Sequence, residues 1–304
     1  KRLLLPKVRK SPVIGIIPIS KGCLGSCAFC LTKKARGALE SYPARDIVRE
    51  VELAVKDGCK EVWLTSQDTA CWGMDIKSSL PVLLRAIFEV DGDFKVRLGM
   101  GNPEWFGRYV PELIEIFRHK KMFKFLHIPL QSGDDEILKS MRRPYTVKEF
   151  KDITLALRKA HPDITLSTDM IVAFPGETQE QFNASLRLVE EVQFDVVNIS
   201  RFSAHEGVAA ASFEGQVHSN DAKERSIFLR QRADYAGFER NKKWLNWVGE
   251  VIVDEQGQVK GTWISRNYCY KPIAIEGKFR LGDKIKVRID NLTSLALRGK
   301  LSSE

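Results

Sequence analysis

The chain has 304 residues, of which 43% are hydrophobic, so it is long enough for about two domains with a sizeable core. It carries 48 Lys and Arg against 39 Asp and Glu, and this net charge of +9 favours a polyanionic partner such as nucleic acid, although a mild excess can also serve solubility alone. No apolar run is long enough to cross a bilayer, and the apolar stretch at the start is too short for a signal peptide. The length and the six scattered cysteines also exclude a small secreted protein held together by disulfides.

From residue 13 to about 203, short apolar segments alternate with amphipathic ones. We expect strands at 13–20, 61–65, 95–99, 123–130, 164–172 and 195–202, and helices near 44–57, 79–90, 110–119, 147–160 and 178–193. Six strand–helix units predict a parallel sheet with right-handed crossovers. Six units instead of eight indicate an α/β fold with a partial, open (β/α)6 barrel, whose chemistry lies on the loops after the strands.

The loop after the first strand holds Cys23, Cys27 and Cys30 in the spacing C-x3-C-x2-C. Thiolates this close can bind one iron–sulfur centre, and three ligands leave one iron of a [4Fe–4S] cubane open to a small molecule. A structural zinc site would need a fourth ligand, and no other Cys or His lies near this loop, but zinc or a coincidence of spacing stays the alternative. Because a thiolate cluster needs a reducing compartment, we expect a cytoplasmic protein.

The character of the chain changes after about residue 240. A charged helix is expected at 220–243, followed by five short strands at 247–254, 258–265, 270–276, 284–290 and 294–300, which predict a small all-β barrel of the oligonucleotide-binding (OB) kind. Cations beside aromatic residues in this module predict a surface for RNA backbone and stacked bases: Arg266, Tyr268, Lys271 and Arg280. A solvated face with core tyrosines is the alternative. We divide the chain into a linker (1–12), the partial barrel (13–240) and the β module (241–304).

Several expected strands end in polar strings: Leu64–Gly73, His127–Gly133, Thr168–Thr178 and Phe202–Val208. With the cysteine triplet, these strings resemble the radical S-adenosylmethionine (SAM) methylthiotransferases over nearly the whole chain, and the β module is similar to the TRAM RNA-binding domain. Three details resemble the archaeal and eukaryotic tRNA branch of that family: Leu5–Lys10, the pair Ala35–Gly37 and Ser41–Pro43, and Leu64–Thr69. This resemblance implies a transferase that inserts a methylthio group at carbon 2 of N6-threonylcarbamoyladenosine, next to the anticodon.

The resemblance also implies roles for single residues. The three cysteines hold the cluster, SAM binds its open iron, and a 5′-deoxyadenosyl radical abstracts the hydrogen, so no acid–base pair is expected. The implied SAM-binding residues are Phe29, Gln67, Asp68, Ser132, Arg143 and Asp169. Structural roles are the alternatives: packing for Phe29, a helix cap for Gln67 and Asp68, a helix-end cation for Arg143 and a buried network for Asp169.

This chain departs from the family in what it lacks. Family members hold a second [4Fe–4S] cluster, the source of the sulfur, on three cysteines of an N-terminal domain. Here about a dozen residues precede the first strand, and Cys59, Cys71 and Cys269 lack the spacing of ligands. We expect Cys59 to be a buried thiol and Cys71 a free loop thiol. Residues 1–12 then form a linker from a missing domain, and the chain is expected to be a catalytic core that does not complete sulfur insertion alone.

Two smaller departures concern the strand ends. Ala173 replaces a usual Gly, and the string His205-Glu-Gly-Val208 replaces a usual Arg-Pro-Gly-Thr. The expected partners are tRNA and an electron-donor protein, with no membrane, and the chain is expected to be a monomer. The alternatives are the sister activities on isopentenylated adenosine or a ribosomal protein, and a non-catalytic RNA-binding Fe–S protein.

Overall fold

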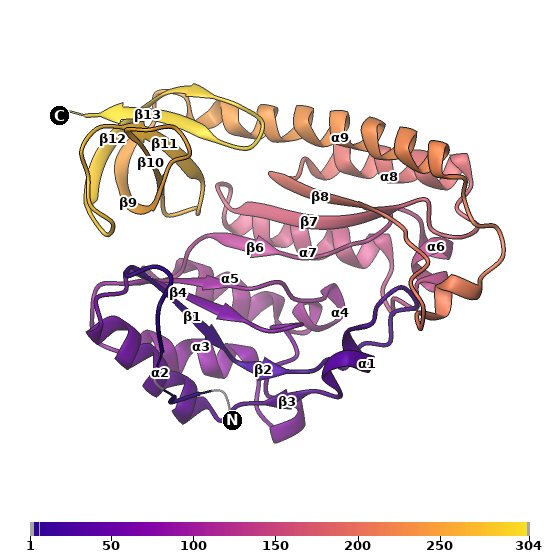
Figure 1. Ribbon diagram of the computed structural model, residues 1–304, viewed down its shortest axis with the longest axis horizontal. Helices are drawn as coiled ribbons and strands as arrows, with labels where there is room; N and C mark the ends of the chain where they lie inside the picture. The colour runs from indigo at the N-terminus through magenta and orange to yellow at the C-terminus, as the bar shows by residue number, and fades with distance from the viewer. Residues whose placement is uncertain (1–2, 6, 303–304) are drawn as a thin grey trace.

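The computed structural model describes residues 3–5 and 7–302 (Figure 1). Its core contains six parallel strands in chain order, arranged as two three-stranded sheets. The first sheet is β1 (Ile14–Pro18), β4 (Glu61–Thr65) and β5 (Lys95–Leu98), and the second is β6 (Phe125–His127), β7 (Thr165–Val172) and β8 (Val196–Arg201). A parallel bridge between Val96 and Met122 joins the two sheets. The predicted partial barrel is confirmed, although it consists of two sheets instead of one.

Helices follow the core strands at the predicted positions: α2 (Ala44–Lys56), α3 (Leu80–Phe88), α5 (Val110–Arg118), α7 (Val147–Ala160) and α8 (Gln179–Val192). Capping boxes start two of them, at Thr146 for α7 and at Thr178 for α8, where each threonine hydroxyl accepts from the backbone three residues on. The buried residues of these helices share one hydrophobic core with alternate residues of the strands. The long helix α9 (Ser219–Asn241) packs on β8 and α8 and leads into the C-terminal module (Figure 1).

Short elements in the connecting segments were not predicted. They are β2 (Ser20–Lys21) and β3 (Glu40–Ser41), which pair as an antiparallel hairpin, α1 (Thr32–Arg36), α4 (Pro103–Phe106), α6 (Asp135–Ser140), and the 3-10 turns η1 (Met74–Ile76), η2 (Gly107–Tyr109), η3 (Ala209–Ser212) and η4 (Lys242–Trp244). Elements of two to six residues are too short to show a hydrophobic period in the sequence.

The C-terminal module is a closed five-stranded β-barrel with the order β10-β11-β13-β12-β9. Its strands are β9 (Val248–Gln256), β10 (Thr262–Arg266), β11 (Pro272–Glu276), β12 (Lys284–Leu292) and β13 (Leu297–Leu301), close to the predicted segments. Its core contains alternate strand residues such as Val251, Val253, Val287 and Ile289. The predicted barrel of the OB kind is confirmed.

The β-barrel caps one end of the core, at the N-terminal ends of all six parallel strands (Figure 1). For each core strand, a residue just before its start contacts the barrel. In the first sheet, Val13 and Lys60 lie against Gly282, and Asp93 pairs with Lys284. In the second sheet, Lys124 donates its N–H to the Tyr268 carbonyl, Asp163 accepts from the Tyr268 hydroxyl, and Asp195 pairs with Lys271. The loops that follow the C-terminal ends of the strands lie at the opposite end of the core.

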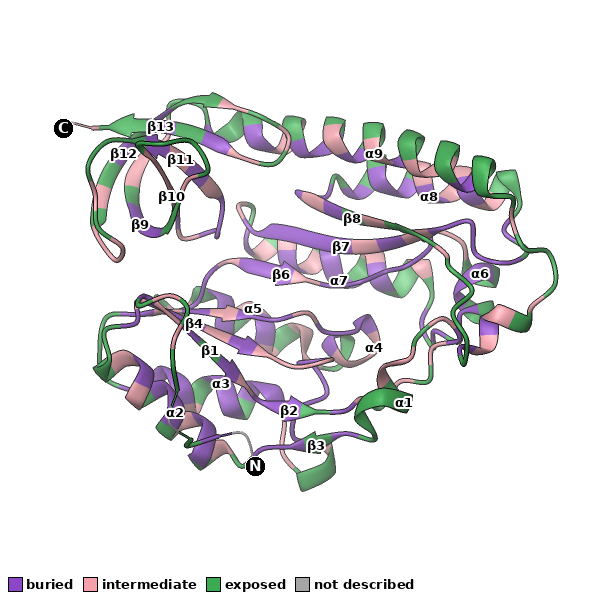
Figure 2. Ribbon diagram, in the orientation of Figure 1, coloured by how far each residue is buried: buried purple, intermediate pink, exposed green. Residues whose placement is uncertain are grey.

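Figure 2 shows the division between this interior and the surface: the core strands are mostly buried, while the outer face of α9 and the segment of α1 are exposed. No helix in the described parts of the chain is both long and apolar enough to span a membrane. Residues 1, 2 and 6 of the predicted linker, and 303–304 of the predicted β module, lie outside the described residues. The predicted domain boundaries stay a prediction.

Candidate functional site: a three-cysteine loop at the open end of the core

The cysteine loop runs between β2 and α1, at the C-terminal end of β1, where the sequence predicts it. The β2–β3 hairpin holds its base, and Gly22 is required there because its φ is +71° and a Cβ would lie 1.9 Å from the Ala38 carbonyl oxygen. Two backbone hydrogen bonds fix the middle of the loop: the Ala28 N–H donates to the Met141 carbonyl (3.0 Å), and the Ala28 carbonyl accepts from Ala210 (2.9 Å). Segments far apart in the sequence therefore position the three thiols.

Two of the three sulfur atoms, those of Cys23 and Cys27, lie over Gly25, and the Cys30 sulfur accepts from the Thr32 N–H (3.3 Å) at the start of α1. A Cβ added at Gly25 would lie 3.5 Å from the Cys23 sulfur and 3.7 Å from the Cys27 sulfur. No three Cys, His, Asp or Glu side chains within residues 3–5 and 7–302 converge tightly enough for a single metal ion. A cubane binds each thiolate to a different iron, so its ligands surround it instead of meeting at one point. Three thiols on one short loop, two of them over Gly25, fit such a cluster, and burial raises the pKa of the Cys23 thiol.

Arg143 connects this loop to the neighbouring strand ends. It is buried, and its guanidinium donates to the Cys27 sulfur (3.1 Å), the Asn102 side-chain oxygen (2.6 Å) and the Pro129 carbonyl (3.1 Å). None of these acceptors belongs to α6, the helix that ends just before Arg143, so the guanidinium makes no hydrogen bond to that helix end. The contact with a ligand sulfur places a positive charge beside the cluster site, which stabilises thiolate charge.

Asp68 lies behind Arg143 in the same chain of hydrogen bonds. Its carboxylate is fully buried and accepts from the Asn102 side chain (2.7 Å), the Asn102 N–H (3.1 Å) and the Ala70 N–H (3.1 Å). Burial raises its pKa, although these hydrogen bonds oppose the shift. Asp68 therefore holds Asn102, which holds Arg143. Asn102 was not predicted as a site residue. The signal for it is its position in the loop that follows β5, since the loops after the strands hold the functional residues of such a core.

Gln67 faces a cavity beside the cysteine loop. The cavity, of about 390 Å³, is lined by residues on both flanks of the loop and at the ends of β1 and β4, including Lys21, Arg36 and Thr65. Within the described residues, Gln67 Oε1 and Ser20 Oγ are buried atoms without a hydrogen-bond partner, and both residues line this cavity. Unpaired buried polar atoms are costly, so this pair is suited to a polar ligand.

The remaining predicted SAM-binding residues, Phe29, Ser132 and Asp169, lie in three different surroundings. Phe29 packs on a small apolar cluster with Phe174 and Met141. Ser132 is fully buried, and its hydroxyl accepts from the Asp134 N–H (3.3 Å) at the start of α6. Asp169 is half-buried on β7, where one carboxylate oxygen contacts the His127 Nε2 (2.8 Å) and accepts from the Asn198 amide (2.8 Å).

Burial alone would raise the pKa of Asp169, but His127, Asn198 and the charge of Arg143 together outweigh it, so the pKa lies below its usual value. Asp169 thus orients two polar side chains, His127 and Asn198. His127 begins the strand-end string His127–Gly133, but the sequence alone predicted no role for it.

The other three cysteines lie outside the loop. Cys59 is buried, as expected, and Cys269 is buried in the barrel core. Cys71 is free, as expected, and it is fully buried; its thiol donates to the Asp68 carbonyl (3.3 Å). Burial raises the pKa of Cys71, which keeps it a neutral thiol.

The predicted RNA-binding residues are divided between the interior and the surface. Lys271 is buried, with its ammonium group on Asp195 (2.8 Å) and Asn241 (2.7 Å), so RNA cannot reach it in this structure. Arg266 pairs with the buried Asp254 (3.0 Å), and the Tyr268 hydroxyl donates to Asp163 (2.9 Å). These three side chains stabilise the barrel or its docking on the core. Arg280 is exposed and stays a candidate.

The strand-end departures also have structural counterparts. Ala173 has a φ of +60°, a left-handed conformation that glycine adopts freely, which explains why Gly is usual at this position. Glu177, after Gly176, precedes the cap of α8 and pairs with Arg225 of α9 (2.7 Å). His205 lies in an exposed turn, as preferred.

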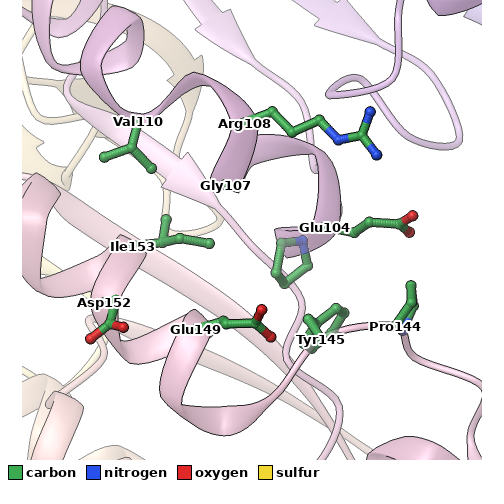
Figure 3. Close-up of a pocket in the computed structure, with 10 residues that line it drawn as sticks. Glu104, Gly107, Arg108, Val110, Pro144, Tyr145, Glu149, Asp152 and Ile153 are labelled. Atoms are coloured by element: carbon green, nitrogen blue, oxygen red, sulfur yellow. The ribbon is translucent and has the colours of Figure 1, made fainter.

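Figure 3 shows a larger cavity, of about 550 Å³, outside this site. It lies between α4, η2 and the start of α7, and its polar lining is Glu104, Arg108, Glu149 and Asp152. It contains none of the predicted site residues. Its Tyr145 hydroxyl accepts from Arg143 Nε (2.6 Å), so this cavity lies behind the site.

Comparison with known proteins identifies the class. The family model for the Radical SAM superfamily matches residues 17–189, so the chain is a radical SAM protein. Among solved structures, the radical SAM methyltransferase TsrM from Kitasatospora setae aligns with a TM-score of 0.52 at 18% identity, covering 66% of this chain and 39% of that one. Coproporphyrinogen III oxidase from Escherichia coli aligns with a TM-score of 0.50 at 13% identity, covering 94% and 70%. Both likenesses show the fold alone.

Curated relatives define the family more narrowly. The probable threonylcarbamoyladenosine tRNA methylthiotransferase of Pyrococcus abyssi is 39% identical over 99% of this chain, which spans 70% of that protein. The corresponding protein of Archaeoglobus fulgidus is 42% identical over 96% of this chain, which spans 68% of it. In Drosophila pseudoobscura pseudoobscura, the threonylcarbamoyladenosine tRNA methylthiotransferase is 36% identical over 98% of this chain, which spans 54% of it. The chain belongs to the family of threonylcarbamoyladenosine tRNA methylthiotransferases, as the sequence strings predict.

Proposed function

We propose that this chain is the catalytic core of a tRNA methylthiotransferase that binds one [4Fe–4S] cluster and SAM and acts at carbon 2 of N6-threonylcarbamoyladenosine, next to the anticodon. The observation that carries the proposal is the loop of three thiols at the open end of the core, with the Cys23 and Cys27 sulfurs over Gly25 and a buried cation on the Cys27 sulfur. When bound, the cluster and SAM supply one-electron chemistry that activates an unreactive C–H bond.

The chain's own residues have distinct roles in this proposal. Cys23, Cys27 and Cys30 bind the cluster. Arg143 donates to the Cys27 sulfur, and Asp68 and Asn102 fix the guanidinium for that contact. Gln67 offers an unpaired acceptor to the amino group of SAM at the edge of the cavity. Phe29, Ser132 and Asp169 complete the proposed SAM site, with Asp169 acting through His127 and Asn198.

The proposal includes the rest of the predicted system. We expect a second cluster to be held by a domain that precedes residues 1–12 in a longer protein, and we expect sulfur insertion to require it. The proposed partners are tRNA and an electron-donor protein, with the chain acting as a cytoplasmic monomer of three parts, 1–12, 13–240 and 241–304.

The test is anaerobic reconstitution with iron and sulfide, followed by reduction in the presence of SAM. We expect about four irons per chain, because a cubane holds four, and the release of methionine from SAM. The Cys23→Ala, Cys27→Ala and Cys30→Ala variants should lose both, while Cys59→Ala should keep both. About eight irons per chain, or no methionine at any reductant strength, contradicts the proposal.

For RNA binding, we propose the exposed face of β12, because Lys271 is buried and Arg266 is paired with Asp254. Lys284, Lys286 and Arg288 are exposed at alternate positions of this strand. With Arg280 they form the proposed backbone-binding surface. Lys286→Glu should weaken tRNA binding and flatten its salt dependence, whereas Lys148→Glu, on the exposed face of α7 in the core, should not. Equal effects of the two variants would contradict this assignment.

A further inference from the structure

The inner faces of the core strands line a lumen that begins at the proposed SAM site. On β4, Val62 and Leu64 are buried in the core under the helices, so Trp63 and Thr65 face inward. The strand register places Ile16, Trp63 and Arg97 in one row across β1, β4 and β5. Two cavities border this face: one of about 380 Å³ between the segment 7–11 and the side chains of Ile16 and Trp63, and the one of about 390 Å³ that includes Thr65 and Gln67. Arg97 lines neither of them and lies deeper, in the same row as Ile16 and Trp63.

The β-barrel closes the far end of this lumen with Tyr270. The Tyr270 ring lies 4.9 Å from Phe123, 5.2 Å from Phe125 and 6.1 Å from Trp63, measured between ring centroids. Tyr270 is buried, and with the other three rings it forms one aromatic cluster. The lumen is therefore open at the cysteine loop and closed at the barrel.

Arg97 is the cation of this closed end. Its guanidinium lies over the rings of Phe125 (4.8 Å), Tyr270 (5.1 Å) and Trp63 (5.2 Å). Aromatic faces cover the planes of a guanidinium but leave its N–H groups free in the plane. Within the described residues, Arg97 Nε is buried without a hydrogen-bond partner. A desolvated cation with unused donors is suited to an anion.

Glu61, the acid whose charge acts on Arg97, does not pair with it in the described residues. Glu61 Oε2 accepts from the Trp63 indole N–H (2.8 Å), and Glu61 Oε1 is buried without a hydrogen-bond partner. A further unpaired group lies at the same level: Thr165, paired in register with Phe125, has a buried hydroxyl without a partner among the described residues. Three unmatched polar groups at the end of one lumen, on Arg97, Glu61 and Thr165, indicate a polar ligand that accepts from the guanidinium and the hydroxyl.

We infer that Arg97 is a specificity-determining residue that binds the carboxylate of the threonylcarbamoyl group, with the adenine held above it. This inference rests on the proposed function and deepens it by assigning the N6 substituent to the lumen. Gln67 lies four residues beyond Trp63, two residues past the end of β4, so an extended chain separates the two by at most about 13 Å. An adenine with an extended N6 arm, laid along the lumen, bridges that distance between the SAM site and Arg97. An isopentenyl arm would leave Arg97 and Thr165 unpaired, so the site rejects it.

The test is a binding cycle that needs no turnover. An anticodon stem-loop RNA carries either threonylcarbamoyladenosine or its methyl ester, which removes the carboxylate charge, and each is titrated against the wild-type chain and Arg97→Met. We expect the ester to weaken wild-type binding roughly 10- to 100-fold, as for a lost charged hydrogen bond, and to have no effect on Arg97→Met. Arg97→Lys should recover part of the preference for the acid.

Arg108→Met is the matched control, because Arg108 also lies over an indole ring, that of Trp105 (4.5 Å), but on the outer surface. It should behave as the wild type. A stem-loop with unmodified adenosine reports on damage to the fold, since its affinity should be the same for Arg97→Met and the wild type. Equal wild-type affinity for acid and ester, or an equal loss of all three RNAs in Arg97→Met, overturns the inference.

These outcomes are distinguishable from failure of the proposed function. Loss of SAM cleavage with an intact binding cycle contradicts the proposed function and leaves the inference standing. A wild-type preference for threonylcarbamoyladenosine over adenosine without an ester effect overturns only the role of Arg97.

Discussion

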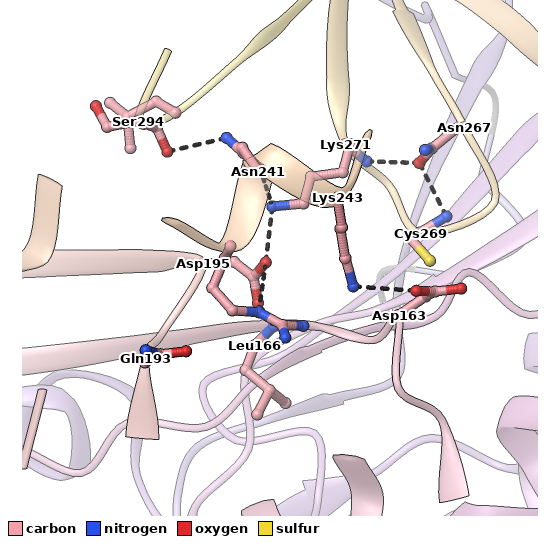
Figure 4. A network of polar contacts seen from close by, with 12 residues as sticks. Asp163, Leu166, Gln193, Asp195, Asn241, Lys243, Asn267, Cys269, Lys271 and Ser294 are labelled. Carbon is pink, nitrogen blue, oxygen red and sulfur yellow. Dashed lines mark hydrogen bonds and ion pairs between the residues drawn. The ribbon is translucent and has the colours of Figure 1, made fainter. Parts of the chain in front are cut away.

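Replacing Lys271 with Met should weaken the docking of the β-barrel on the core, and the resulting loss in the free energy of unfolding can be worked out from the contacts of Lys271. The Lys271 ammonium donates to Asp195 (2.8 Å) and Asn241 (2.7 Å), and both side chains of the ion pair are buried, at 3% and 0% exposure (Figure 4). The variant loses a buried charged hydrogen bond, worth about 1.5–3 kcal/mol, and leaves the Asn241 oxygen unpaired, at about 1–3 kcal/mol.

The surroundings of Asp195 limit this cost. Arg158 (3.5 Å) and Arg240 (3.7 Å) remain near the carboxylate, and the Leu166 N–H donates to it (2.9 Å), so its charge stays compensated. We therefore expect Lys271→Met to lower the free energy of unfolding by about 3 kcal/mol, at the low end for a broken buried pair. Asp195→Asn should cost more, because it leaves the buried Lys271 and the partly buried Arg158 and Arg240 without their shared anion.

The assay is chemical and thermal unfolding followed by tryptophan fluorescence. A loss of about 3 kcal/mol lowers the thermal midpoint by roughly 6–12 °C in a chain of this size. Lys284→Met is the matched control, because Lys284 also joins the barrel to the core through Asp93 (2.8 Å), but with the Asp93 side chain 65% exposed. It should cost less than about 1 kcal/mol. Equal effects of Lys271→Met and Lys284→Met, or a smaller effect of Asp195→Asn, would refute the reasoning.

The same pair predicts a dependence on pH. Burial alone would raise the pKa of Asp195, but Lys271 and the two arginines outweigh it, so the pKa lies below its usual value. A carboxyl with a lowered folded-state pKa contributes stability that is fully present above its unfolded pKa, near 4, and is lost as the pH falls through the folded value. The difference between the wild type and Lys271→Met should therefore be constant from pH 5 to 8 and shrink below about pH 4.

Three further predictions concern the interior and the cysteine loop. Burial, reinforced by the charge of Asp254, raises the pKa of Glu61 from 4.5 to about 7. The free energy of unfolding of the wild type should therefore decrease as the pH rises from 4.5 to 7. Glu61→Gln should remove this pH dependence and raise the free energy of unfolding at pH 8 by roughly 1–3 kcal/mol in unfolding titrations. Gly25→Ala should leave the thermal midpoint of the iron-free chain unchanged but lower reconstituted iron from about four to below two per chain, because the new Cβ would lie 3.5 Å from the Cys23 sulfur and 3.7 Å from the Cys27 sulfur and crowd both ligands. Arg143→Gln should shift the reduction potential of the cluster to more negative values by roughly 60–130 mV in a titration followed by electron paramagnetic resonance, because it removes the cation on the Cys27 sulfur; an unchanged potential would contradict that contact.

The fold could be predicted because its main elements have strong local patterns. Buried parallel strands are short apolar runs, and each of the six expected strands contains an observed one, from β1 to β8. The helices α7 and α8 start at Thr146 and Thr178, whose capping boxes are visible in the sequence. The β2–β3 hairpin is set by contacts instead: Ser20 and Lys21 pair with Ser41 and Glu40 around the cysteine loop, and no pattern in two residues predicts that.

The part of the candidate site that comes from one loop could be predicted from the sequence. The part that several loops build together could not. The cysteine spacing is local, so its position followed from the sequence. Asn102 joins Asp68 to Arg143 through contacts 34 and 41 residues apart, which sequence spacing does not show. Lys271 was misread for the same reason: a lysine among aromatic residues indicates RNA, but its anion, Asp195, lies 76 residues away.

The placement of the β-barrel limits how one RNA can contact the whole chain. The barrel covers the N-terminal ends of the core strands, whereas the cysteine loop lies at their C-terminal ends (Figure 1). The eight residues of β7 alone separate these ends by about 26 Å. Tyr270 closes the lumen at the barrel end, so a target base enters from the cysteine end or the open edge at β1. An RNA whose target base lies in the lumen therefore reaches the cations of β12 only along the outside of the core, with a part of its backbone far from that base. The barrel can then add affinity for the RNA, while the choice of the base depends on the lumen.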